Sequence, residues 1–145
     1  MFVNLVINLY ICLIKYPPDA KSRDNSDVIS DYFADFFETK SANFIGLILD
    51  DVPTISFITQ IELLSRKTDA NIENGIKDFR KNCYIKNINP EIISHCVKVR
   101  RINKLKTPDS IIVGNALAFG LTIITNNSKD FSNIKSLKTI NPYSL

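Results

Sequence analysis

The stretch from residue 104 to 131 most constrains the fold of this chain, because it combines a helix, a buried strand and the start of another helix. Thr107 is a suitable N-cap, and Pro108 suits the first helical position. Apolar residues then recur at the spacing of one helical face, at Ile112, Val113, Ala116 and Leu117. Gly120 follows as a C′ residue that would end the helix.

Two acids lie at the ends of the elements in this stretch. The β-branched run at 121–125 is bounded by turn residues and predicts a strand, which Asn126 and Asn127 end. Asp109 and Asp130 then fall at element ends, where the sites of parallel α/β sheets collect. Asp109 also heads the apolar face of its helix, so its carboxylate needs a partner, because an unpaired buried charge is costly.

Strands and helices alternate along the rest of the chain. Strands are predicted at 2–7, 54–57, 83–86 and 138–140, and helices at 9–15, 26–40, 58–67, 69–81 and 89–103. Residues 41–49 fit no single pattern. A chain of 145 residues without repeats or linkers therefore predicts one domain over residues 1–145. The predicted architecture is a three-layer α/β/α sandwich around a mainly parallel sheet.

The apolar stripe of the predicted 26–40 helix runs from Val28 to Phe37 and has two interpretations. A stripe of this width at helical spacing is typical of a face that packs into the core. An interface with another protein is the alternative.

Composition excludes several classes of protein. A hydrophobic content of 45% is too high for a disordered chain, and a net charge of +3 is too small to indicate nucleic-acid binding by itself. Cys12, Cys83 and Cys96 are odd in number and form no C-x-x-C motif, which predicts reduced thiols in a cytoplasmic protein. The apolar segment 2–14 is shorter than the roughly 20 residues of a membrane span and lacks the basic start of a signal peptide.

Three stretches match one known pattern in order and in spacing. They are Ile55–Ser65 around Glu62, Thr107–Ile112 around Asp109, and Leu121–Phe131 with Asp130, the last followed by Ile140-Asn-Pro142. Together with the N-terminus they resemble the PIN-domain family, in particular the VapC-type toxins of bacterial toxin–antitoxin pairs. The resemblance covers nearly the whole chain.

The resemblance implies a metal-dependent nuclease that cuts RNA. Glu62, Asp109 and Asp130 would bind Mg²⁺ or Mn²⁺, since hard oxygen ligands favour these ions over zinc. Asn8 and Asn127 would orient ligands, water or substrate. The implied partners are an RNA substrate, a cognate antitoxin and a second copy of the chain in a homodimer. No membrane association is implied.

Each of these side chains also has a purely structural interpretation. An acid or amide at a helix start can cap the helix, and an acid there is worth about 0.3–1 kcal/mol; this fits Asn8, Asp109, Asn127 and Asp130. Glu62 follows Ile58 by four residues, which places it beside the face that Ile58 and Ile61 are predicted to bury. Alternatively it faces solvent or pairs with a neighbouring cation, Arg66 or Lys67.

The N-terminus departs from the family pattern. The family's first strand ends in Asp-x-Asn, whereas the matching residues are Val6, Ile7 and Asn8. Valine cannot bind a cation, so we expect weaker metal binding and reduced or absent cleavage. A catalytically dead PIN-fold protein that binds antitoxin or RNA is the alternative. A third possibility is an unrelated α/β domain whose acids are helix caps.

A basic run precedes Asp109. It consists of Lys98, Arg100, Arg101, Lys104 and Lys106, with no acid between them. Arg100, Arg101 and Lys104 share a helical face, and an RNA backbone would need such a rim beside an acidic pocket. A solvated helix face is the alternative.

Overall fold

The computed structural model describes residues 9–11, 28–125 and 128–145. Its strands are β1 (Leu9–Ile11), β2 (Thr54–Ser56), β3 (Tyr84–Lys86), β4 (Thr122–Ile124) and β5 (Lys138–Ile140). Its helices are α1 (Val28–Phe33), α2 (Thr39–Asp50), α3 (Phe57–Leu64), α4 (Ala70–Lys81), α5 (Pro90–Ile102), α6 (Thr107–Phe119), α7 (Ser128–Phe131) and the 3₁₀ helix η1 (Pro142–Ser144). No helix in this part of the chain combines the length and the apolarity needed to cross a membrane.

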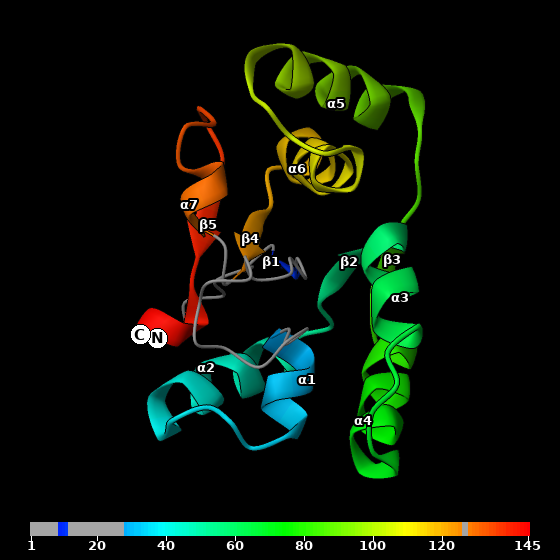
Figure 1. Cartoon of the computed structure of the whole chain (residues 1–145), viewed down its shortest axis with the longest axis vertical. Helices are drawn as coiled ribbons and strands as arrows, with labels where there is room; N and C mark the ends of the chain where they lie inside the picture. Colours follow the sequence, from blue (N-terminus) through cyan, green and yellow to red (C-terminus); the bar gives the residue numbers. More distant parts are fainter. Residues whose placement is uncertain (1–8, 12–27, 126–127) are drawn as a thin grey trace, which may run out of the picture.

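The strands form one parallel sheet in the order β3-β2-β1-β4-β5, with β1 at its centre (Figure 1). Helices cover both of its faces, because neighbouring residues of β4 belong to different cores. Ile123 packs with apolar residues of α5, α6 and α7, whereas Ile124 packs with residues of α1, α2, α3 and α4. This confirms the predicted three-layer α/β/α sandwich.

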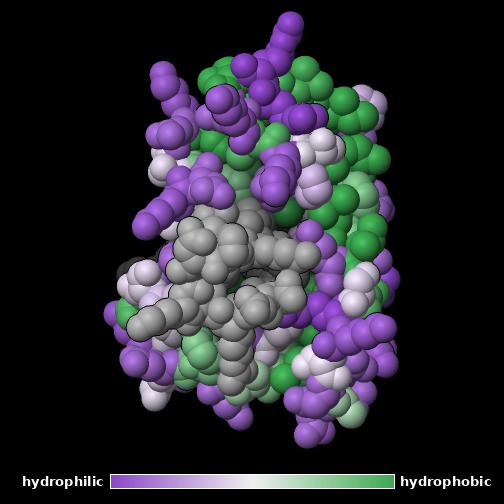
Figure 2. All heavy atoms as spheres, viewed as in Figure 1, coloured by the Kyte–Doolittle hydropathy of each residue, from purple (hydrophilic) through white to green (hydrophobic). Residues whose placement is uncertain are grey.

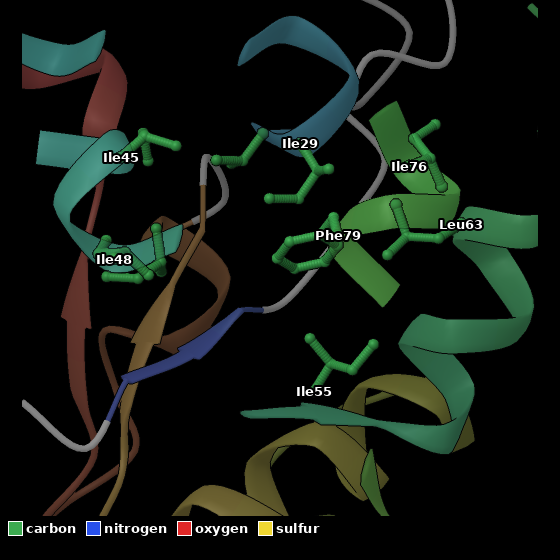
Figure 3. Packing of buried hydrophobic residues seen from close by; sticks show 9 residues of the cluster. Ile29, Ile45, Ile48, Ile55, Leu63, Ile76 and Phe79 are labelled. Atoms are coloured by element: carbon green, nitrogen blue, oxygen red, sulfur yellow. The ribbon is translucent and has the colours of Figure 1, made fainter. Parts of the chain in front are cut away.

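The core that contains Ile124 joins elements that lie far apart in the sequence. Figure 3 shows side chains from α1, α2, β2, α3 and α4 converging on it, namely Ile29, Ile45, Ile48, Ile55, Leu63, Ile76 and Phe79. Burial of each such side chain contributes roughly 1.5–3 kcal/mol. The short strands, which supply few ladder hydrogen bonds, are therefore held in place mainly by the helices packed on them.

The N-terminal part of the chain differs from the prediction. The helix predicted at 9–15 is wrong at its start, because residues 9–11 form β1 and pair with both β2 and β4. Sequence periodicity alone does not separate a short buried strand from a buried helical turn. The strand predicted at 2–7 lies outside the described residues.

The single helix predicted at 26–40 is two helices. α1 ends at Phe33, and Asp35 follows with a φ of +54°, a left-handed conformation that a continuing α-helix cannot contain. The chain restarts at Thr39 as α2, which also settles the ambiguous residues 41–49 as helical. The predicted core stripe divides accordingly: Val28 and Ile29 are buried, whereas Phe36 is half exposed.

The remaining elements follow the predicted boundaries closely, and their caps explain why. Asp69 and Asn89 accept hydrogen bonds from the backbone N–H groups of Ile72 and Ile92 at the starts of α4 and α5. At α6 the predicted cap is wrong by one residue, because Lys106 is the N-cap and Thr107 is already helical. Gly120 ends α6 as predicted, with a φ of +62°.

Gly120 and Gly46 should respond oppositely to replacement by alanine. Gly120→Ala places a Cβ in a left-handed conformation and should lower the free energy of unfolding by about 1 kcal/mol, although the Cβ would meet no atom within 4 Å. Gly46→Ala, inside α2, gains helix propensity and should raise it by about 0.5–1 kcal/mol. Urea denaturation of the two variants measures both values, and a shared sign would contradict the assignment of Gly120 as the helix end.

The described cysteines, Cys83 and Cys96, are free thiols. Burial raises the pKa of the Cys83 thiol to about 12, although the charge of Arg80 counteracts this, and the thiol donates a hydrogen bond to the Phe79 carbonyl. Burial also raises the pKa of Cys96. Since the thiolate is the reactive form, both thiols should be inert near neutral pH.

In a Cys12→Ser background, we therefore expect iodoacetamide to label the folded chain slowly at pH 8 and to label the urea-unfolded chain rapidly. Because the pKa of Cys83 is about 12, raising the pH to 9 should leave it largely unlabelled. Mass spectrometry of tryptic peptides measures the labelling of each cysteine. Equal rates in the folded and unfolded chains would contradict the burial of these thiols.

Candidate functional site

The strand order creates a switch point between β1 and β4. From β1 the chain builds β2 and β3 on one side, and it then crosses to the other side for β4 and β5. Ligands of open α/β sheets bind beyond the carboxyl ends of the strands at such a point. Here the last residues of the two strands, Ile11 and Ile124, are paired with each other.

α6 brings Asp109 to this edge of the sheet. Only Gly120 and Leu121 separate the end of α6 from β4, so the helix runs back antiparallel to the strand and its N-terminus lies at the carboxyl edge. Asp109 is in the first turn of α6 and is half-buried. The residues predicted to share its buried face, Ile112, Val113 and Ala116, are buried, so the position of Asp109 at the head of that face is confirmed.

Asp130 is close enough to Asp109 for the two carboxylates to repel each other. It lies on the short helix α7, which begins four residues after β4 ends, and it is exposed. Burial raises the pKa of the Asp109 carboxyl above its usual value, the negative charge of Asp130 raises it further, and the Lys106 ammonium lowers it. The structure therefore brings these two predicted site residues together in an electrostatically unfavourable pair.

Glu62 lies on α3, which leaves the carboxyl end of β2 directly and contacts α6. Ser56 caps this helix by accepting a hydrogen bond from the Ile58 N–H. The predicted buried face is wrong, because Thr59 and Leu63 are the buried residues of α3 and Ile61 is 56% exposed. Glu62 is half-buried beside that corrected face.

The other predicted site residues lie outside the described part of the chain. These are Asn8 and Asn127, together with Val6 at the position of the missing acid. Within residues 9–11, 28–125 and 128–145, no three His, Cys, Asp or Glu side chains are grouped closely enough to hold a metal ion. The complete ligand set thus stays a prediction, of which the pair Asp109–Asp130 is the part seen together.

The predicted basic rim lies at the same end of α6 as Asp109. Arg100 and Arg101 are in the last turn of α5, and Lys104 lies in the short connection to α6. All three are exposed. α5 and α6 pack against each other along their length, so this rim and the acidic pair belong to one packed unit (Figure 1).

Two residues near these elements were not assigned a role from the sequence. Lys106, which the sequence analysis treated only as one cation of a basic run, is the N-cap of α6, and its charge lowers the pKa of Asp109. Its spacing of three residues from Asp109 was the available signal.

Asp31 is only 4% exposed, but the Tyr143 hydroxyl donates a hydrogen bond to it, which joins η1 to α1. That bond makes Asp31 a structural acid that ties the C-terminus to the core.

Solved structures of toxin–antitoxin proteins share this fold. A toxin–antitoxin complex from Klebsiella pneumoniae is 30% identical over 79% of this chain and 94% of its own, with a TM-score of 0.59. The promoter-bound VapBC2 from Rickettsia felis is 21% identical over 78% and 92% of the two chains, with a TM-score of 0.63. DNA-bound VapBC from Salmonella typhimurium is 16% identical over 94% and 98%, with a TM-score of 0.67.

The chain belongs to the VapC-type PIN-domain toxins. No protein-family model and no curated protein sequence matches it. The membership therefore rests on the fold together with the identity to the Klebsiella complex. For a VapC-type chain, the acidic pair at the carboxyl edge is the natural candidate for the centre of activity.

The repulsion within the acidic pair predicts how Asp109 titrates in the metal-free chain. Replacing Asp130 by Asn removes one of the causes that raise the pKa of Asp109, so that pKa should fall towards its usual value. Carbon-13 NMR of labelled aspartate carboxyls measures it. A pKa of Asp109 that does not change in Asp130→Asn would show that the two carboxylates do not interact.

Burial of Asp109, together with the charge of Asp130, also sets the direction of a stability effect. The pKa of Asp109 is higher in the folded than in the unfolded chain, so the unfolded chain loses its proton first as pH rises and stability falls across that window. Asp109→Asn should therefore be more stable than the wild type near pH 7, and this advantage should vanish in acid below both pKa values. Thermal melts at the two pH values measure the difference.

Proposed function

We propose that this chain is a VapC-like, metal-dependent endoribonuclease that hydrolyses a phosphodiester of RNA. The observation that carries the proposal is the mutual repulsion of Asp109 and Asp130 at the switch point of the sheet. Two carboxylates held together at a cost to stability are expected where a function requires them. The membership of the chain among VapC-type toxins supports the same conclusion.

The donor chemistry of the pair fits a hard divalent cation. Carboxylate oxygens suit Mg²⁺ or Mn²⁺, and a bound cation would offset the repulsion that raises the pKa of Asp109. We assign Asp109, Asp130 and Glu62 as the ligands, with Asn127 orienting water or substrate. Asn8 precedes β1 in the sequence, so we assign it no role at the carboxyl edge. When bound, the cation lowers the pKa of a coordinated water and stabilises negative charge on the attacked phosphate.

The basic rim would hold the RNA backbone beside the acidic pair. Arg100, Arg101 and Lys104 are exposed, and the last turn of α5 and the start of α6 place them at the same end as Asp109. Contacts to phosphates supply affinity that depends on salt and little on sequence. These basic side chains would thus offset the repulsion between the acidic pair and the RNA backbone, and would leave the choice of cleavage position to other contacts.

The position of β1 changes how the missing N-terminal acid is interpreted. Val6 precedes β1 in the sequence, whereas a ligand at the carboxyl edge is expected to follow the strand. Between the end of β1 and the start of α1 the sequence contains Asp19, Asp24 and Asp27. We therefore propose that the fourth ligand is one of these acids, and that the valine weakens cleavage only if none of them serves.

A second candidate function is a non-catalytic PIN-fold protein that binds antitoxin or RNA. It is favoured by one observation, that the described residues contain no group of three ligands able to hold a metal ion. Such a protein would keep the basic rim and would bind Mn²⁺ weakly or not at all. We propose an antitoxin, an RNA and a second copy of the chain as the partners in either case.

The decisive experiment is cleavage of RNA by the purified chain with added Mn²⁺ or Mg²⁺. Asp109→Asn and Asp130→Asn should each lower the cleavage rate by more than about tenfold, because each removes a proposed ligand. Asp78→Asn is the matched control, since Asp78 is an exposed acid on α4 that pairs with Lys81. Wild-type cleavage that survives both site variants would overturn the proposed site.

Further variants locate the fourth ligand. Val6→Asp should raise cleavage sharply if position 6 belongs to the site, whereas Asp19→Asn, Asp24→Asn or Asp27→Asn should abolish it if the acid comes from the segment after β1. Calorimetric titration with Mn²⁺ gives an independent readout of the site. Binding of RNA without measurable Mn²⁺ binding or cleavage would favour the non-catalytic protein.

A further inference from the structure

We propose that Lys106 is a further catalytic residue, whose ammonium group donates a hydrogen bond to the phosphate that is cleaved. The inference rests on the proposed function, because it names a residue that acts on the RNA at the same site. It is supported by the place of Lys106 at the start of α6, by the unfavourable choice of lysine for that position, and by the carboxylates beside it.

The backbone of Lys106 is fixed at the end of α6 that reaches the carboxyl edge of the sheet. Its carbonyl accepts a hydrogen bond of 3.0 Å from the Ser110 N–H, which begins the helix. Leu105 precedes it and packs against the core that contains Ile123. Pro108 follows in the first turn, where its fixed φ suits the helix. The side chain of Lys106 therefore starts from a defined point near the acidic pair.

Lys106 and Asp109 are neighbours on the surface of α6. Lys106 is the N-cap, and Asp109 is the third helical residue after it. Side chains at these two positions are close enough to interact in capping boxes, and residues three apart are adjacent on a helix. In agreement with this placement, the charge of Lys106 lowers the pKa of Asp109. The ammonium group thus lies within electrostatic range of the acidic pair.

Lysine is an unfavourable N-cap for the helix itself. An N-cap side chain usually accepts a hydrogen bond from an N–H of the first turn, as Ser56, Asp69 and Asn89 do for α3, α4 and α5. Lysine has no acceptor, and Lys106 makes no such bond. Its charge also faces the positive end of the helix dipole. A residue that breaks a local rule in this way is expected at a functional site.

The ammonium group of Lys106 is available to an external anion. The side chain is exposed, and among residues 9–11, 28–125 and 128–145 it has no ion-pair partner, Asp109 included. Figure 2 shows mainly hydrophilic side chains on the upper left of the molecule, where α7 and the connection between α5 and α6 lie in Figure 1. An anion that approaches the acidic pair from solvent would therefore meet this charge.

The phosphodiester of RNA is the anion that suits this arrangement. Its hydrolysis adds the oxygen of water to phosphorus, breaks the bond from phosphorus to the leaving ribose oxygen, and leaves one water proton on that oxygen. Negative charge on the other phosphate oxygens is stabilised by donors that are already in place. Lys106 forms no covalent bond in this step and donates a hydrogen bond to one of those oxygens. The basic rim, in contrast, holds neighbouring phosphates.

Binding of single-stranded RNA in EDTA tests the phosphate contact without cleavage. Lys106→Met should reduce the slope of log Kd against log salt concentration by about 0.7, the value for one phosphate contact to a single strand. Lys106→Arg should keep the wild-type slope, because the positive charge remains. Lys77→Met is the matched control and should also keep that slope, since Lys77 is an exposed lysine of α4, which packs on the other face of the sheet.

Cleavage at saturating Mn²⁺ tests the contact during the reaction. Lys106→Met should lower kcat by at least about tenfold and change KM by less than about threefold, whereas Lys106→Arg should stay within about threefold of the wild type. Calorimetry should show that Lys106→Met binds Mn²⁺ at least as tightly as the wild type, because a positive charge beside the ligands is removed. Circular dichroism verifies that each variant is folded.

The outcomes separate this inference from the proposed nuclease. A lysine that only supports the fold or the ligands would weaken Mn²⁺ binding when replaced and leave kcat at saturating Mn²⁺ unchanged. Cleavage by the wild type with an unchanged kcat in Lys106→Met would thus overturn the role of Lys106 and leave the nuclease intact. A wild type that never cleaves would contradict the nuclease and the catalytic step, while a reduced slope in EDTA would still assign Lys106 as a phosphate contact.

Discussion

The need to cover β4 on both faces determines most of this structure. Ile123 and Ile124 are adjacent in the chain and are fully buried in different cores, so helices must lie on each side of the sheet. Because only two residues connect α6 to β4, the helix must run antiparallel to the strand. The N-terminus of α6 thereby reaches the carboxyl edge, and Asp109 arrives there as a consequence of packing.

Packing also explains why the acidic pair is unfavourable without a ligand. The buried residues of α6 occupy consecutive positions from Ile112 to Ala116, so the helix is held on several sides and the position of its first turn is fixed. Burial and the charge of Asp130 both raise the pKa of Asp109, while Lys106 only partly offsets them. The buried carboxylate of Asp109 thus lowers the free energy of unfolding, and the two apolar cores compensate for this loss, as is common at functional sites.

Local signals predicted the C-terminal half well, whereas the N-terminal half depended on distant contacts. α6, Gly120 and β4 follow from capping, periodicity and a β-branched run within 18 residues. β1 could not be identified in this way, because its three residues become a strand only by pairing with β2 and β4 more than 40 residues away. Local signals likewise placed Asp109 and Asp130 at the ends of neighbouring elements. The buried face of α3 was misjudged, because it depends on the distant elements that pack against this helix.

The close approach of α5 to α6 links the site to the rest of the surface. A Cβ on Gly114 of α6 would collide with the Cys96 sulfur and come within 3.1 Å of backbone atoms of Cys96 and Ile92, so only glycine allows the helices to pack at this separation. α5 is consequently fixed relative to Asp109, and its basic end is fixed with it. The spacing between Asp109 and the basic end of α5 is therefore set by one glycine in the buried helix.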